Sequence, residues 1–119
     1  MLTFVCYPKC TTCQKAKALL DSLNTSYEIR DIKTDNPSYD ELKGWLALSG
    51  LPVRKFFNTS GLLYKSLALK DKLQSMSEED CLKLLATDGM LVKRPLLVVD
   101  EHRVLVAFKR DEWESVVKE

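Results

Sequence analysis

Two cysteines separated by two residues lie where an apolar segment gives way to a helical pattern. Residues 2–6 are predicted to form a short buried strand, Cys10 and Cys13 follow it, and apolar residues then recur at helical spacing up to residue 23. The N-terminus of a helix carries unpaired N–H groups and a partial positive charge, so it favours a thiolate over a thiol. A cysteine at such a position has a lowered pKa and is a good nucleophile. The sequence therefore predicts a thiol redox centre between a strand and a helix.

The same pattern predicts different environments for the two cysteines. Cys13 lies three residues before Ala16 and seven before Leu20, so it shares the apolar face of the predicted helix. Cys10 precedes the first helical turn, and we expect it to be more exposed. This asymmetry suits an attacking Cys10 and a shielded Cys13 that resolves the adduct.

The rest of the chain predicts an α/β fold. The predicted segments are a strand at 27–32, helical segments at 36–50, 51–57, 62–73 and 77–86, hairpin strands at 96–99 and 104–106 around a turn at 100–103, and a helix from 110 to 117. The first long helix is expected to start at residues 36–38, with Pro37 near its first turn, and Gly50 is expected to end it. Strand, helix and strand in succession imply a parallel pair. The order is that of a thioredoxin-like fold, a small mixed sheet flanked by helices, in one domain (1–119) with an all-helical insertion at about 36–90.

Composition and charge exclude several classes of protein. The 119 residues are 45% apolar and 29% charged with a net charge of +1, which is typical of a soluble globular domain and gives no basic nucleic-acid footprint. No apolar segment approaches the ~20 residues of a membrane span. The first residues do not resemble a signal peptide, so we expect a cytoplasmic protein, in which such a cysteine pair is catalytic, redox-sensing or metal-binding.

Three other interpretations of the cysteines are less favoured. They could be buried by chance, or they could form half of a zinc site, which would need further ligands from Cys6, Cys81 and His102. Cys6, Cys10 and Cys13 also have the spacing that binds an iron–sulfur cluster in radical enzymes, but those enzymes need a larger barrel. Cys6 and Cys81 are predicted to be core residues, and His102 a surface residue. We expect no metal site.

Arg94 and Pro95 are the second informative pair. A proline directly before an apolar strand often marks a tight, sometimes cis, turn. In thioredoxin-like folds such a proline faces the redox cysteine, so Arg94 would place a permanent positive charge beside Cys10, lower its pKa and bind an oxyanion. The alternative is a solvated surface arginine. We expect Arg94 and Pro95 to form the substrate site with Thr11 and Thr12.

Three motifs resemble those of a known superfamily. The segments 10–16 (CTTCQKA), 93–96 (KRPL) and 56–61 (FFNTSG) are similar to motifs of the glutaredoxin-linked arsenate reductases, and in particular to their Spx-like branch of small bacterial proteins. The resemblance extends over nearly the whole chain. It implies the thioredoxin-like fold with a helical insert, Cys10 as the reactive residue, and reduction of arsenate to arsenite. It also implies that glutathione, glutaredoxin or thioredoxin serves as reductant, with no bound cofactor, and that the substrate is a small oxyanion or a protein or glutathione disulfide.

The match to the arsenate reductases is incomplete. Those enzymes use one cysteine and three arginines, of which Cys10 and Arg94 have counterparts here. The second arginine falls where this chain has Asn58, and the third falls near Phe108 and Lys109. The candidates to replace them are Arg54, Lys109 and Arg110.

The second cysteine supports a rival hypothesis. Cys13 is the residue that Spx-type transcription regulators carry, and this resemblance implies binding to the RNA polymerase alpha subunit, without direct nucleic-acid contact, under the control of a Cys10–Cys13 disulfide. The chain ends at Glu119, shorter than those regulators. A third hypothesis is a scaffold in which both cysteines are inert.

Overall fold

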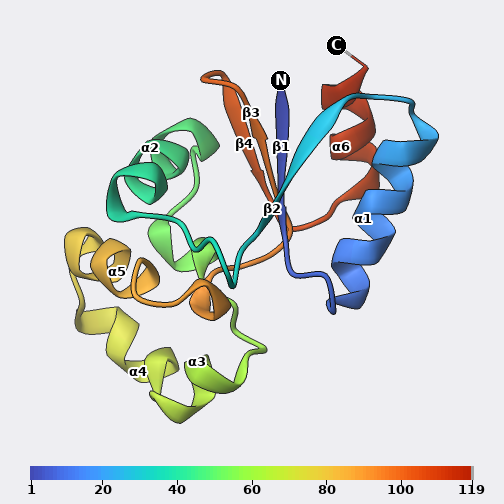
Figure 1. The fold of residues 1–119 in the computed structure, drawn as a ribbon. Helices are drawn as coiled ribbons and strands as arrows, with labels where there is room; N and C mark the ends of the chain where they lie inside the picture. The colour runs from blue at the N-terminus through green and yellow to red at the C-terminus, as the bar shows by residue number, and fades with distance from the viewer. Residues whose placement is uncertain (119) are drawn as a thin grey trace.

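A four-stranded mixed sheet organises the computed structural model, which describes residues 1–118 (Figure 1). The strands are β1 (Leu2–Cys6), β2 (Tyr27–Asp31), β3 (Leu96–Val99) and β4 (Arg103–Val106), in the order β2-β1-β3-β4. β1 and β2 are parallel, whereas β3 is antiparallel to both β1 and β4. The predicted α/β class and thioredoxin-like arrangement are confirmed.

Helices cover both faces of this sheet (Figure 1). α1 (Thr11–Ser22) and α6 (Arg110–Val117) lie on one face. The helical insertion packs on the other face and consists of α2 (Tyr39–Ser49), α3 (Leu62–Ser66), α4 (Leu69–Lys72) and α5 (Glu78–Leu85), with 3-10 turns η1 (Val53–Phe56), η2 (Leu73–Ser75) and η3 (Gly89–Leu91). The chain enters α1 and β3 at the same end of the sheet, because β1 and β3 are antiparallel neighbours.

The alternation of side chains along β1 separates two cores. Phe4 and Cys6 point into the layer of α1 and α6, where they pack with Cys13 and Trp113. Val5 points into the opposite layer, among residues of the insertion. Cys6 is therefore a core residue on the same side as the cysteine pair, as the sequence predicts.

The helix α2 starts slightly later than predicted. Ser38 is the N-cap and forms a capping box with Glu41, so the helix begins at Tyr39, and Pro37 lies just before the cap, near the first turn. The serine hydroxyl satisfies an N–H group of the first turn, which a proline cannot do. Gly50 ends the helix in the left-handed conformation, at φ +70°, which confirms its predicted role.

Smaller differences concern the periphery. Arg103 is the first residue of β4 and not part of the preceding turn, whereas His102 lies exposed in that turn as predicted. Trp45 packs against the core of the insertion beneath the guanidinium of Arg30, whose carbon lies 5.7 Å from the ring centroid. Cys81 is buried, in agreement with the sequence. Within residues 1–118 no helix has the length and apolar character needed to span a membrane.

Candidate active site

Cys10 lies at the boundary between the β1–α1 loop and α1. It is the N-cap of the helix, with an extended backbone at φ −83° and ψ 124°. Its N–H donates to the carbonyl of Tyr7 (2.9 Å), and its own carbonyl accepts the N–H of Gln14 (3.1 Å), the first hydrogen bond of the helix. The thiol is therefore placed at the positive end of α1 and remains partly exposed.

The surroundings of Cys10 favour its thiolate. Burial acts to raise the pKa of Cys10, but hydrogen bonds from the backbone N–H groups of Cys13 and Thr12, from the Cys13 thiol and from the Arg94 guanidinium outweigh it. The net pKa of Cys10 lies below the ordinary value of a thiol. The predicted nucleophile thus has the electrostatic environment that its role requires.

Cys13 is the opposite case. Its side chain is 2% exposed, and its sulfur accepts the N–H of Tyr7 at 3.4 Å. Burial, together with the hydrogen bond and charge of Cys10 and the charge of Cys6, raises the pKa of Cys13 to about 12, although the N–H of Tyr7 acts to lower it. All four cysteines are free thiols in this structure. The site therefore pairs an activated sulfur with a protonated one that donates a hydrogen bond to it.

Arg94 faces this pair from the turn before β3. The Arg94–Pro95 peptide bond is cis, and the guanidinium carbon lies 5.2 Å from the ring centroid of Tyr7. Nε and Nη1 of Arg94 are buried and have no hydrogen-bond partner within the described part of the chain. The guanidinium also donates a hydrogen bond to Cys10, so a permanent positive charge with unused donors lies beside the nucleophile.

The other residues expected to bind substrate differ in their exposure to solvent. Thr11 and Thr12 are exposed in the first turn of α1, and the backbone N–H of Thr12 points to the Cys10 sulfur. Pro95 is buried and its carbonyl accepts the N–H of Ala107 at 3.0 Å. The structure therefore joins the turn before β3 to the end of β4 beside the cysteine pair.

Other residues occupy the two positions where the resemblance to arsenate reductases implies an arginine. Asn58 is 8% exposed, and its N–H donates to the carbonyl of Leu91 at 2.8 Å. Phe108 packs edge-on against Trp113, with ring centroids 5.3 Å apart, and Lys109 is exposed. Of the proposed replacements, Arg54 and Lys109 line a common pocket with Lys93, whereas Arg110 opens α6 and does not line it.

Tyr7 is a site residue that the sequence interpretation missed. Its ring supports Arg94 and its backbone N–H contacts Cys13, so it connects the two halves of the site. The signal available was an aromatic residue directly after the first strand and three residues before Cys10. In residues 1–118, no group of three or more His, Cys, Asp or Glu side chains is arranged to hold a metal ion.

Comparisons with known proteins agree with this geometry. The model of the ArsC family matches residues 6–116, which include both cysteines and the Arg94–Pro95 turn. The solved structure of an ArsC-family-related protein from Bacteroides fragilis is 56% identical, with a TM-score of 0.93 over 97% of this chain and 96% of that one. A Streptococcus mutans UA159 structure, described as a possible arsenate reductase, is 47% identical, with a TM-score of 0.88 over 96% and 98% of the two chains. The regulatory protein MgsR of Bacillus subtilis strain 168 is 30% identical over 111 residues, 93% of this chain and 86% of MgsR.

Proposed function

The chain belongs to the ArsC family, and we propose that it is a thiol–disulfide oxidoreductase in which Cys10 attacks the substrate and Cys13 resolves the adduct. The observation that carries this proposal is the opposite perturbation of two neighbouring thiols. The pKa of Cys10 is lowered by hydrogen bonds that outweigh its burial, whereas burial raises that of Cys13 to about 12. An inert pair has no need of such an asymmetry.

With a disulfide as substrate, the reaction is two successive exchanges. The Cys10 thiolate forms a mixed disulfide with one sulfur of the substrate, and the other sulfur leaves as a thiolate. Cys13 then loses its proton and attacks the Cys10 sulfur, which releases the second substrate thiol and leaves a Cys10–Cys13 disulfide. Once Cys10 is covalently bound it no longer carries a negative charge, so one cause of the raised pKa of Cys13 disappears when Cys13 must react.

Arsenate is the oxyanion substrate we propose, because the guanidinium of Arg94 contacts Cys10 and supplies a positive charge there, and because the S. mutans relative is described as a possible arsenate reductase. Cys10 displaces one oxygen of arsenate as water and forms a sulfur–arsenic bond. Attack of Cys13 on the Cys10 sulfur makes the disulfide and transfers two electrons to arsenic, which leaves as arsenite. Arg94 balances the charge of the bound anion in both steps.

The disulfide must be reduced before the next cycle. We propose glutathione, glutaredoxin or thioredoxin as the reductant, and the cytoplasm as the location, because a reducing compartment keeps the four thiols free. No metal or organic cofactor enters the scheme, since thiol exchange supplies both electrons.

Turnover tests this proposal most directly. Reduced protein is assayed with arsenate and, separately, with a small disulfide, each in the presence of glutathione, glutaredoxin or thioredoxin. The variants are Cys10→Ser, Cys13→Ser, Arg94→Gln and Arg94→Lys, with Cys81→Ser as the control, because Cys81 is equally buried but lies in the other core.

The expected pattern separates the roles. Cys10→Ser abolishes both activities, and Cys13→Ser stops after the first covalent step. Arg94→Gln lowers arsenate turnover by a factor of about 100, the usual effect of removing a donor that stabilises an oxyanion, whereas Arg94→Lys retains part of it. Disulfide turnover without arsenate turnover would remove arsenate and keep the oxidoreductase. Absence of both would refute the proposal.

A second candidate function is redox-sensing regulation, which the similarity to the regulatory protein MgsR favours. In this case the Cys10–Cys13 disulfide changes the affinity of the protein for the RNA polymerase alpha subunit. Binding of the isolated alpha subunit to the oxidised and reduced proteins measures this directly. Equal or absent binding of the two forms would exclude the regulator and leave the enzyme untouched.

A further inference from the structure

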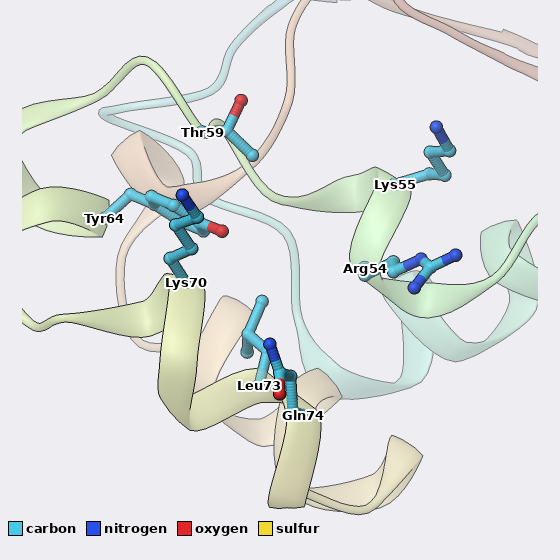
Figure 2. Close-up of a pocket in the computed structure, with 7 residues that line it drawn as sticks. All are labelled: Arg54, Lys55, Thr59, Tyr64, Lys70, Leu73 and Gln74. Carbon is cyan, nitrogen blue, oxygen red and sulfur yellow. The ribbon is translucent and has the colours of Figure 1, made fainter.

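A cleft in the helical insertion is lined by cations that have no internal partner. The cleft has a volume of about 440 Å³ and lies between η1, α3, α4 and η2. Figure 2 shows Tyr64 and Lys70 on one side of it and Arg54 and Lys55 on the other. The remaining lining residues are Thr59, Leu73 and Gln74. Neither redox cysteine lines this cleft.

The cations in the cleft do not serve the fold. The side chains of Arg54, Lys55 and Lys70 take part in no ion pair or hydrogen bond with any of residues 1–118, and no carboxylate lines the cleft. Unpaired cations also occur elsewhere on the surface, beside paired ones such as Arg30 with Glu41; the cleft differs in that three cations gather there and no carboxylate lines it. In a chain with a net charge of only +1, such a local excess of positive charge indicates an anionic ligand.

The positive lining continues beyond this first cleft. An adjoining pocket of about 310 Å³ shares Arg54, Lys55 and Thr59, and adds Lys93 and Lys109. The two pockets together are lined by five cations, Arg54, Lys55, Lys70, Lys93 and Lys109, and by no carboxylate, which suits several anionic groups better than a single one. Arginine and lysine with a nearby hydroxyl are typical donors to phosphate oxygens, and the volume is in the usual range for a small-molecule site.

We propose that this cleft binds a small ligand that carries a chain of phosphate groups, with Arg54, Lys55 and Lys70 as the phosphate-binding residues. The hydroxyl of Thr59 and the amide of Gln74 add neutral donors at its edges. The ligand is inorganic polyphosphate or a nucleoside polyphosphate, which share this chemistry. No cysteine lines either pocket, and the proposal does not depend on the redox function.

Calorimetric titration of the reduced, full-length protein tests the site. The probes are inorganic tripolyphosphate and ATP without magnesium, at about 0.15 M salt, where charges beyond about 8 Å are screened. The test variant is the double mutant Lys55→Gln, Lys70→Gln. The control is Lys33→Gln, Lys43→Gln, which removes the same charge from exposed lysines that line neither pocket.

The test variant is expected to bind tripolyphosphate at least about tenfold more weakly, since two charged hydrogen bonds are lost, and the control is expected to bind like the parent. Tighter binding of ATP than of tripolyphosphate identifies a nucleotide, and equal binding identifies the inorganic chain. Cys10→Ser and Arg94→Gln are expected to retain full affinity. Loss of binding in Arg94→Gln would place the phosphates at the thiol site and overturn the proposal. The proposal would also be overturned if both double variants bound tripolyphosphate equally weakly, or if the parent protein did not bind it.

Discussion

The asymmetry of the two redox thiols leads to a quantitative prediction for their alkylation. A thiol with a pKa of about 12, as for Cys13, is ionised only to about 3 × 10⁻⁵ at about pH 7.5, whereas an unperturbed thiol is about one-tenth ionised. Because only the thiolate reacts with iodoacetamide, Cys13 should react at least about a thousandfold more slowly than a free cysteine. Its exposure of 2% slows it further. Cys10 should react faster than a free cysteine at a pH below the ordinary thiol pKa.

The perturbation that tests the cause is Cys10→Ser. This change removes the charge and the thiol of Cys10, both of which act to raise the pKa of Cys13, and leaves burial as the main remaining cause. Cys13 should therefore be alkylated faster in the variant than in the parent, yet still more slowly than in unfolded protein. In Cys13→Ala, which removes the side-chain donor, Cys10 loses one hydrogen bond to its thiolate and should become less reactive.

Mass spectrometry of alkylated peptides, sampled over time in the reduced protein, follows each cysteine separately. Cys81 is the internal control, because it is also 2% exposed and burial raises its pKa, but it lies in the core of the insertion. Its slow rate should be the same in all variants. Parent protein in which Cys13 reacts as fast as Cys10 would refute the assigned roles. A faster Cys81 in Cys10→Ser would show that the variant opens generally, and Cys13 would then have to be compared with Cys81.

Two further predictions concern the frame that holds the site. The carboxylate of Glu41 accepts a hydrogen bond from Nη2 of Arg30 at 2.9 Å, and the Arg30 guanidinium is the main reason that the pKa of Glu41 falls to about 2. Since the folded-state pKa is lowered, this stability is present above about pH 4.5 and is lost as the pH falls towards 2. Because the carboxylate is partly exposed, Glu41→Gln should lower the free energy of unfolding, measured in urea at neutral pH, by about 1 kcal/mol. Near pH 2 the same change should have almost no effect. A difference in unfolding free energy that does not vary with pH would contradict this prediction. Gly89→Ala should cost at least about 3 kcal/mol, because its Cβ would lie 1.6 Å from the carbonyl oxygen of Ile32. Gly44→Ala, in the middle of α2 where the added Cβ meets no neighbouring atom, should instead raise the free energy of unfolding by about 0.5–1 kcal/mol. Thermal or urea unfolding measures both variants, and equal effects of the two changes would contradict the prediction.

Local signals in the sequence were sufficient for the redox pair. The end of an apolar strand, a helix start and a three-residue offset are all encoded within residues 2–20, so the burial of Cys13 and the partial exposure of Cys10 could be predicted. The turn at Arg94 and Pro95 was found for the same reason, because proline restricts the backbone wherever it occurs. Elements with strong periodicity, such as the β3–β4 hairpin, were also found close to their observed bounds.

Features that depend on distant segments could not be predicted in this way. The phosphate-binding cleft joins Arg54, Lys55 and Lys70 across two helical segments, and each of these residues alone has the pattern of a solvated surface charge. The contact of Tyr7 with Arg94 spans most of the chain. The start of α2 was predicted too early, because proline and a capping serine are both typical of the start of a helix. Only the hydrogen bond from the N–H of Glu41 to the hydroxyl of Ser38 shows that Ser38 is the cap.

The separation of local from distant determinants also explains why the thiol chemistry is better defined than the substrate. Cys10 obtains most of its activation from its own helix, through the N–H groups of Thr12 and Cys13, so any sequence that keeps the strand, the spacing and the helix start keeps a nucleophile. The anion site depends instead on residues contributed by other segments, and this chain has kept Arg94 while it has Asn58 where a second arginine is expected. A substitution at position 58 or 109 can therefore change which anion binds without changing the reactivity of Cys10. Asn58→Arg should raise arsenate turnover relative to the turnover of a neutral disulfide, and an unchanged ratio would show that Arg94 alone sets the choice of anion.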